Sequence, residues 1–332
     1  MTSIGDSAFR LCTGLTSATI PSDGASFSCN SVFCDCDKLS TIIFAEGVSS
    51  IKNQNLGYIK ALERVVLPSS VTSIGDSAFS NCAGLTSIEL PSGVTSIGDS
   101  AFSGCTGLTS IELPFGLTSI YGGVFSGCTG LTNIEIPSSV TSISERAFYN
   151  CSSLTSIEIP TSVTGIALDA FSGCSNLTVC VEKNSYAHRW AQENKVTFHL
   201  LSPEVTRIAV EQTLPETGET NNYTVTVEGG TAPYAYKYTL LKDGAVYSES
   251  DWVAESSYQV EYKEAAVYVM QVQVKDAEDR LSEPVSSAEI VVTEPIQIIA
   301  VTSEITECEI GETNNYAVTV EGGTAPYAYK YT

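Results

Sequence analysis

Residues 102–114, FSGCTGLTSIELP, contain the pattern that decides the fold of the first 200 residues. The pattern F-x-x-C-x-x-L-x-x-I-x-L-P returns at a step of 23 residues, and its first position is Phe79, Phe102, Phe125, Phe148 and Phe171. Toward the N-terminus Leu56 and Phe33 keep this step, and Phe9 precedes Phe33 by 24 residues. Self-similarity at a fixed period of this length is typical of solenoids, so we predict about eight stacked coils.

The segment Leu85–Leu90 predicts a short strand in each coil, with Ile88 and Leu90 pointing inward and Ser87 and Glu89 pointing outward. One coil buries about seven apolar side chains, which contributes roughly 10–20 kcal/mol. Ordering 23 backbone units costs more, at about 1–2 kcal/mol each. No coil is therefore expected to fold alone, and strands of successive coils should pair about 4.8 Å apart into one long parallel sheet.

Two further positions of the repeat carry expectations. Proline follows the strand, as at Pro91, and ends it because proline cannot donate to a ladder. Asp99 is expected to cap a brief helical turn that carries Ala101 and Phe102 inward.

Cysteine is the next repeating residue, because most of the 11 cysteines occupy one position of the coil. These are Cys12, Cys36, Cys82, Cys105, Cys128, Cys151 and Cys174, and Ile59 takes the position in the third coil. A buried free cysteine behaves as a small hydrophobic residue, which is the interpretation we favour. Cys29, Cys34 and Cys36 form an irregular cluster, for which a zinc site and a disulfide of Cys29 or Cys34 stay as alternatives. Cys180 and Cys308 carry no readable signal.

The repeat resembles the BspA-like leucine-rich repeats of bacterial surface proteins, over residues 1 to about 200. The third coil departs from the pattern, because Lys52–Leu56 lacks the Ala-Phe pair. Arrays of this family often end in a cap, and Asn184-Ser185 is expected to start a helix through Tyr186, Ala187, Trp190 and Ala191. The resemblance implies binding to host extracellular-matrix or plasma proteins, or to other microbial surfaces.

From Pro203 the period is lost, and short alternating segments suggest a β-sandwich. The predicted strands are 205–210, 223–228, 234–241, 258–262, 267–275 and 290–293. The sequence GGTAPYAYKYT at 229–239 recurs at 322–332 and resembles bacterial immunoglobulin-like (Ig-like) or PKD-like modules. We therefore predict a mainly β chain with three parts: a capped leucine-rich repeat solenoid at 1–202, an Ig-like β-sandwich at 203–294, and a truncated second Ig-like module at 295–332.

The amino-acid composition and net charge exclude some classes of function. The formal net charge of −22 argues against binding to nucleic acid or to an anionic membrane, because phosphates would be repelled. No apolar run approaches the roughly 18 residues of a membrane-spanning helix. The chain starts in mid-coil and shows no signal peptide, and we expect a fragment of a longer, extracellular or cell-surface protein.

Catalysis is poorly supported, and we predict no catalytic, cofactor or metal site. His188 and His199 are the two histidines, both in or beside the expected cap, and no serine or cysteine stands in a nucleophile motif. Calcium binding by the acidic second region stays open.

The outward side of the sheet is the candidate binding surface. One predicted outward column runs Thr19, Ile43, Val66, Glu89, Glu112, Glu135, Glu158 and Val181. We take the following residues as candidates: Ile43, Val66, Ser87, Glu89, Ser110, Glu112, Asn133, Glu135, Ser156 and Glu158. The glutamates form either a solvated face or a stripe that attracts basic partner segments or cations. Ile43 and Val66 either reflect simple drift of the repeat sequence or form an apolar patch that contacts a partner.

These observations favour a bacterial surface adhesion or recognition protein, in which the sandwich modules act as spacers. The alternative is an ancillary region of a large secreted hydrolase, with the catalytic domain elsewhere. A wall-anchoring signal in the flanking sequence would support the first, and a hydrolase domain the second.

Overall fold

A computed structural model describes the chain except residues 1–2, 5–6, 22–25, 28–31, 34, 53–55, 305–309, 311–312, 324 and 331–332, and the side chains at 3, 4, 26 and 27. The described chain forms two compact units, residues 1–200 and 201–332. The predicted domain boundaries at residues 202 and 294 stay predictions. Cys29, Cys34 and Cys308 lie outside the described residues, so the alternatives for the cysteine cluster stay open.

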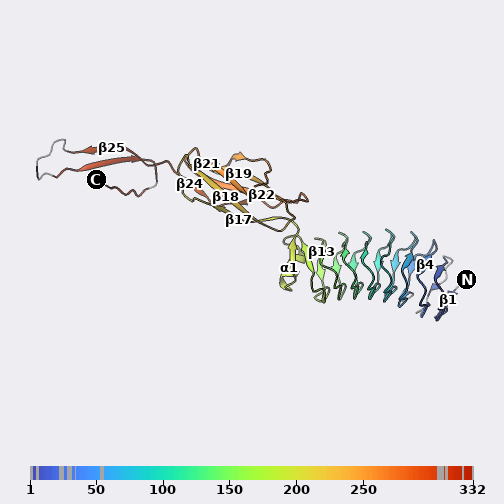
Figure 1. The fold of residues 1–332 in the computed structure, drawn as a ribbon. Coiled ribbons are helices and arrows are strands. Elements are labelled where there is room, and N and C mark those ends of the chain that lie inside the picture. Colours follow the sequence, from blue (N-terminus) through green and yellow to red (C-terminus); the bar gives the residue numbers. More distant parts are fainter. Residues whose placement is uncertain are drawn as a thin grey trace. The chain divides into compact units, whose positions relative to one another are not determined.

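Stacked coils with short strands on two sides make up the first unit (Figure 1). The strands of the candidate side are β2 (Ser17–Ile20), β4 (Thr41–Phe44), β6 (Arg64–Val66), β9 (Ser110–Ile111), β11 (Asn133–Ile134), β13 (Ser156–Ile159), β15 (Thr178–Val181) and β16 (Phe198–Leu200). Those of the second side are β1 (Ser3–Ile4), β3 (Ser26–Phe27), β5 (Ser50–Ile51), β7 (Ser73–Ile74), β8 (Ser96–Ile97), β10 (Ser119–Ile120), β12 (Ser142–Ile143) and β14 (Gly165–Ile166). The pairs are parallel and in register, as in Ile74 with Ile97.

The prediction of one long parallel sheet is wrong in two respects. The second side carries its own ladder, and the candidate side is divided into the sheets β2-β4-β6, β9-β11 and β13-β15-β16. Residues 85–90 keep the alternation, with Ile88 buried and Glu89 exposed, but they form no regular strand. A hydrogen bond from Thr109 N to Thr86 O joins them to the next coil. Proline follows at Pro91, and its missing N–H limits how far pairing can extend.

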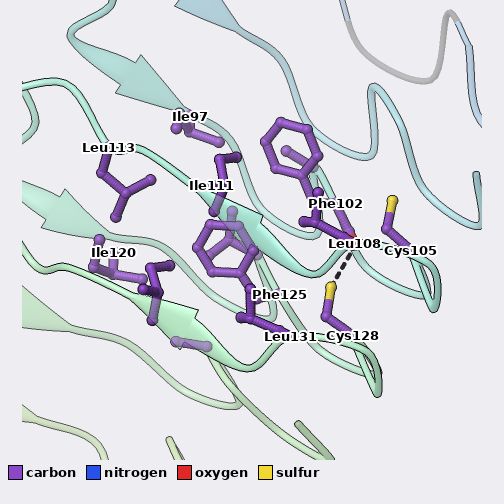
Figure 2. Packing of buried hydrophobic residues seen from close by; sticks show 14 of the residues in the cluster. Ile97, Phe102, Cys105, Leu108, Ile111, Leu113, Ile120, Phe125, Cys128 and Leu131 are labelled. Carbon is purple, nitrogen blue, oxygen red and sulfur yellow. Dashed lines mark hydrogen bonds between the residues drawn. The ribbon is translucent and has the colours of Figure 1, made fainter. Parts of the chain in front are cut away.

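A file of stacked phenylalanine rings runs through the solenoid core (Figure 2). The ring centroids of Phe102 and Phe125 lie 5.9 Å apart, and those of Phe125 and Phe148 lie 5.5 Å apart. These three side chains have no exposed surface. Offset stacking at such separations adds about 0.5–1.5 kcal/mol per pair to the burial of the rings. The single interior file that the 23-residue period predicts is confirmed.

The repeated cysteines are core residues that also make hydrogen bonds. The Cys128 thiol donates to the carbonyl oxygen of Phe102 at 3.1 Å, and the Cys105 thiol makes the same contact with Phe79 (Figure 2 shows the first). Each thiol therefore adds a second hydrogen bond to a carbonyl of the preceding coil that already accepts a backbone N–H, a role that a purely hydrophobic interpretation omits. Burial raises the pKa of the Cys105 thiol to about 12.

One turn position in each coil requires a left-handed backbone. The residue two places after the phenylalanine has a φ of 73° at Gly104 and Gly127, and 59° at Asn81. Glycine and asparagine adopt this region at the lowest cost, and from the fourth coil onward the position is always one of the two; the first two coils have Leu11 and Asp35 there, also with positive φ. Tyr58 takes the same position with a φ of 70°, so the third coil has strained backbone at this turn. Leu56 nevertheless occupies the phenylalanine position in the core and is 1% exposed.

The aspartates before the phenylalanine link coils rather than cap helices. Asp99 Oδ1 accepts the N–H of Gly122 at 2.8 Å, and Asp76 Oδ1 accepts the N–H of Asp99 at 3.0 Å. The segment around Ala101 and Phe102 forms a turn and not a helix, so the expected Asp99 cap is wrong, although both side chains point inward as predicted.

The predicted helix is present as α1 (Tyr186–Glu193). Ser185 is its N-cap, and its Oγ accepts the N–H of His188 at 3.0 Å. Ala187, Trp190 and Ala191 are buried, and the Trp190 ring meets Phe171 edge-on with centroids 5.9 Å apart. The helix therefore covers the end of the phenylalanine file.

Antiparallel sheets make up the second unit, consistent with Ig-like β modules. One sheet has the order β17-β18-β21, and the other has β20-β19-β22-β23 with β24 paired to β22. The strands are β17 (Glu204–Val210), β18 (Thr220–Glu228), β19 (Ala235–Lys242), β20 (Ala245–Glu249), β21 (Ser257–Glu261), β22 (Ala266–Lys275), β23 (Val285–Ser286) and β24 (Ile290–Val292), followed by the pair β25 (Gln297–Ser303) and β26 (Tyr316–Glu321). The six predicted strands are present within one or a few residues, and β20 and β23 were not predicted. The buried hydroxyls of Tyr223 and Tyr262 hydrogen-bond at 2.7 Å.

Candidate functional site

The candidate residues lie on the outward side of one face of the solenoid. Ser87, Glu89, Ser110, Glu112, Asn133, Glu135, Ser156 and Glu158 are exposed, Ile43 is 39% exposed, and Val66 is half-buried. The alternation of the strand explains this arrangement, because the intervening Ile111, Ile134 and Ile157 point into the core. The inward and outward sides were thus predictable residue by residue.

Strand register brings the candidates into rows along the solenoid. Ile43 pairs with Val66 and also with Thr19, so the two aliphatic residues are neighbours on the same face. Ser110 pairs with Asn133, which places Glu112 and Glu135 beside each other two residues further on. Serine and asparagine therefore form one polar row, and the glutamates form a second row parallel to it.

The sequence predicts Val181 as the last residue of the outward column that contains the glutamates, and this prediction is wrong. Glu158 pairs with Cys180, whereas Val181 pairs with Ile159 and has no exposed surface. The cause is a shorter step, because Ser156 pairs with Thr178, 22 residues later, so extrapolation by 23 residues overshoots by one. Cys180 in turn pairs with His199 on β16.

Two polar hollows open on this face where the ladder is interrupted. One, of about 510 Å³, lies between β11 and β13 and is lined by Asn133, Glu135, Ser156 and Glu158. The other, of about 380 Å³, is lined by Arg64, Val66 and Glu89 among others. Both combine hydrogen-bonding groups with carboxylates and can receive polar or basic side chains from a partner.

The four glutamates of the row are not ion-paired within the part of the chain that the structure describes, although Arg64 lines the same hollow as Glu89. These glutamates are Glu89, Glu112, Glu135 and Glu158. Charges at strand spacing repel by about 1 kcal/mol in water, which splayed side chains and salt reduce. The row from Glu112 to Glu158 is therefore negatively charged, and the repulsion between its members is small enough for the fold to tolerate.

The two histidines have different surroundings, one in the cap helix α1 and one on β16. Over the described ranges of the chain, no three His, Cys, Asp or Glu side chains gather in a way that could hold a metal ion. His188 is buried in the cap, where its Nδ1 accepts the N–H of Asn184 at 3.0 Å. His199 is exposed on β16. In the described part of the chain, no helix has the length and apolarity that crossing a membrane would require.

A solenoid with stacked parallel strands, a phenylalanine file and an exposed sheet face defines a leucine-rich repeat protein. The sequence matches the model of the BspA type leucine-rich repeat region in six copies, over residues 1–109 and 56–178. These matches cover more than half of the chain, which therefore belongs to this family.

Solved structures of leucine-rich repeat proteins are similar to this chain. One from Bacteroides ovatus ATCC 8483 is 29% identical, with a TM-score of 0.41 and coverage of 55% of this chain and 59% of that one. The T. pallidum leucine rich repeat protein is 24% identical, with a TM-score of 0.42 and coverage of 60% and 79%. The pneumococcal vaccine antigen PcpA is 16% identical, with a TM-score of 0.36 and coverage of 55% and 60%. This chain thus spans 59% of the length of the Bacteroides ovatus protein. No curated protein matches it.

Proposed function

We propose that the chain is an extracellular or cell-surface recognition protein that binds other proteins through the candidate face of its solenoid and serves in adhesion. The exposed parallel rows carry this proposal: Glu112, Glu135 and Glu158 on one side, and Ser110 and Asn133 on the other. A protein partner is favoured over nucleic acid because the chain has a net charge of −22. The β-sandwich at 203–294, with the module that we place at 295–332, serves as a spacer.

The partner that fits this face presents basic side chains and a small apolar contact. Lysine or arginine residues would meet the exposed glutamates, and an aliphatic or aromatic side chain would meet Ile43 and Val66. Extracellular-matrix and plasma proteins, and proteins on other microbial surfaces, are the partner classes that we propose. The rim charges are expected to act chiefly on the association rate and its salt dependence.

The test is surface capture of purified matrix and plasma proteins by the full chain at physiological salt. The double variant Glu112→Lys/Glu135→Lys is expected to lower capture at least tenfold. The matched control is Glu145→Lys/Glu193→Lys, which makes the same charge change at exposed sites in a turn and on α1, and it should bind as the wild type does. Equal loss in both variants, or no loss in the first, would refute the role of the face.

A further inference from the structure

Strand register on β15 places a cysteine between a glutamate and a histidine. Cys180 pairs with Glu158 on β13 and with His199 on β16. In a parallel ladder, paired residues point to the same face and lie one strand spacing, about 4.8 Å, apart. Glu158 and His199 are exposed and Cys180 is half-buried, whereas Val179 and Val181 on either side of it are buried. The three polar side chains therefore form a row on the outward side of the solenoid, at the end next to the cap.

Cys180 differs from the cysteines of the repeat position. Cys82, Cys105 and Cys128 lie in the core, donate to carbonyl oxygens of the preceding coil, and have a pKa that burial raises. Such thiols stay protonated at neutral pH and are inert toward reagents. The sulfur of Cys180 instead lies 3.5 Å from the Oγ of Ser156 on the outward side of the sheet. Cys180 therefore has the partial exposure that a reactive thiol requires.

The neighbours of Cys180 act on its thiolate in different ways. The imidazole of His199 can take the thiol proton and, as a cation, stabilise the thiolate beside it. An imidazole has two ring nitrogens, so one can serve the thiol while the other keeps a partner of its own. The hydroxyl of Ser156 can donate a hydrogen bond to the sulfur, which also favours the charged form. The carboxylate of Glu158 acts against the thiolate and attracts cations.

We propose that Cys180 is a reactive thiol that exchanges with the disulfide of a small, positively charged ligand and holds one half of it as a mixed disulfide. His199 takes the proton of the thiol, and the Cys180 sulfur attacks one sulfur of the ligand. The new S–S bond forms as the S–S bond of the ligand breaks, and the departing thiolate takes the proton from His199. The ligand disulfide is itself the oxidant, so the step needs no other co-reactant.

The charge around Cys180 selects the class of disulfide. Glu158 is its direct neighbour, and Glu158 and Glu135 line the same hollow. Exposed carboxylates attract ligands that carry ammonium groups and repel anionic ligands, and salt weakens both effects. The exchange does not depend on protein binding by the rest of the candidate face, because it needs only the thiol, its neighbours and a small disulfide.

Site-resolved mass spectrometry of the full chain, in its reduced form and at pH 7, tests the proposal. The probe is cystamine, a small disulfide with two ammonium groups, and digestion after quenching allows the rate at each cysteine to be measured separately. We expect Cys180 to form the mixed disulfide about tenfold faster than Cys12, which is exposed in the first coil, far along the chain from both histidines. Equal rates at the two cysteines would overturn the proposal, because exposure alone would then explain the reaction.

Substitution of the histidine tests its role in proton transfer. His199→Gln should slow the reaction of Cys180 about fivefold or more and leave that of Cys12 unchanged. The matched control is Lys195→Gln, which removes an exposed cation from the turn before β16 and should change neither rate. An unchanged rate in His199→Gln, or an equal loss in the control, would contradict the assignment of His199.

Uncharged and anionic disulfides test the role of the glutamate. With hydroxyethyl disulfide, which carries no charge, Glu158→Gln should speed the reaction of Cys180 about threefold, the effect of one like charge at strand spacing in water. A merely structural role of Glu158 would not raise the rate. Glutathione disulfide, which is anionic, should react about tenfold more slowly than cystamine at Cys180 after each rate is divided by that for N-acetylcysteine. Equal corrected rates would overturn the preference for a positively charged ligand.

Discussion

Replacing Phe125 by alanine is expected to destabilise the solenoid by about 4 kcal/mol, within the range for buried phenylalanine. The side chain has no exposed surface, and its ring stacks on Phe102 at 5.9 Å and on Phe148 at 5.5 Å. Phe9 belongs to the same column, but it is 37% exposed and, among the described side chains, its ring stacks only on Phe33, at 5.4 Å. Phe9→Ala should therefore cost about 1 kcal/mol, near the centre of the usual distribution for point variants.

Urea unfolding followed by tryptophan fluorescence measures this difference. Trp190 lies in the cap of the solenoid and Trp252 in the second unit, so a Trp252→Phe background makes the signal specific for the solenoid. Both variants are compared in that background through their transition midpoints and slopes. If Phe125→Ala cost no more than Phe9→Ala, the stacked file would not be the main stabilising feature of the coils.

Three other predictions follow from contacts between coils. Cys128→Ala should cost about 1–3 kcal/mol, because it leaves a small cavity and removes one of the two hydrogen bonds that the Phe102 carbonyl accepts, the other coming from Cys105 N–H. The exposed Cys12→Ala should stay within about 0.5 kcal/mol in the same urea assay. Asp99→Ala should lower the free energy of unfolding by about 1 kcal/mol, because it removes the hydrogen bond from Gly122 N–H. Asp37, which is also exposed, is the control position for an alanine substitution. Equal effects of the two substitutions would contradict the role of Asp99 in linking coils. Burial raises the pKa of the Cys105 thiol from 9.0 to about 12, so its contribution to stability is fully present below pH 9 and is lost as pH rises toward 12, by about 1 kcal/mol per pH unit. Because burial raises the pKa of Cys82 and Cys128 as well, the contribution of Cys105 is the difference between the wild type and Cys105→Ala in urea unfolding at pH 8, 9, 10 and 11. A difference that does not change with pH in this window would contradict it.

The phenylalanine file and the inward or outward side of each strand residue could be predicted from the sequence. Both depend on local periodicity, and a repeated apolar position has one stable location when coils stack. The helix α1 was also predictable, because Ser185 is a strong N-cap residue and Trp190 follows at helical spacing.

Other features depend on contacts that periodicity does not encode. The second ladder is made of two-residue strands such as Ser73–Ile74, which are too short to show alternation. Asp99 resembles a helix cap in sequence, but its partner is the backbone of the next coil. The step that brings Cys180 beside Glu158 has 22 residues rather than 23, and pairing alone reveals it. For the candidate face, the sequence indicates which residues point outward. The chemistry of the partner depends on which outward side chains of neighbouring coils lie next to one another, and strand pairing decides this.

Deleting one whole period tests the central claim, that interchangeable 23-residue coils stack into a continuous solenoid, most directly. Removal of residues 103–125 joins Phe102 to Ser126 and restores the pattern F-S-G-C, so that Phe102 can stack on Phe148. We predict a folded protein with a buried Trp190 and a cooperative urea transition, whereas deletion of residues 103–114 should abolish both. Unfolding by the full-period deletion, or equal tolerance of the two deletions, would contradict the account.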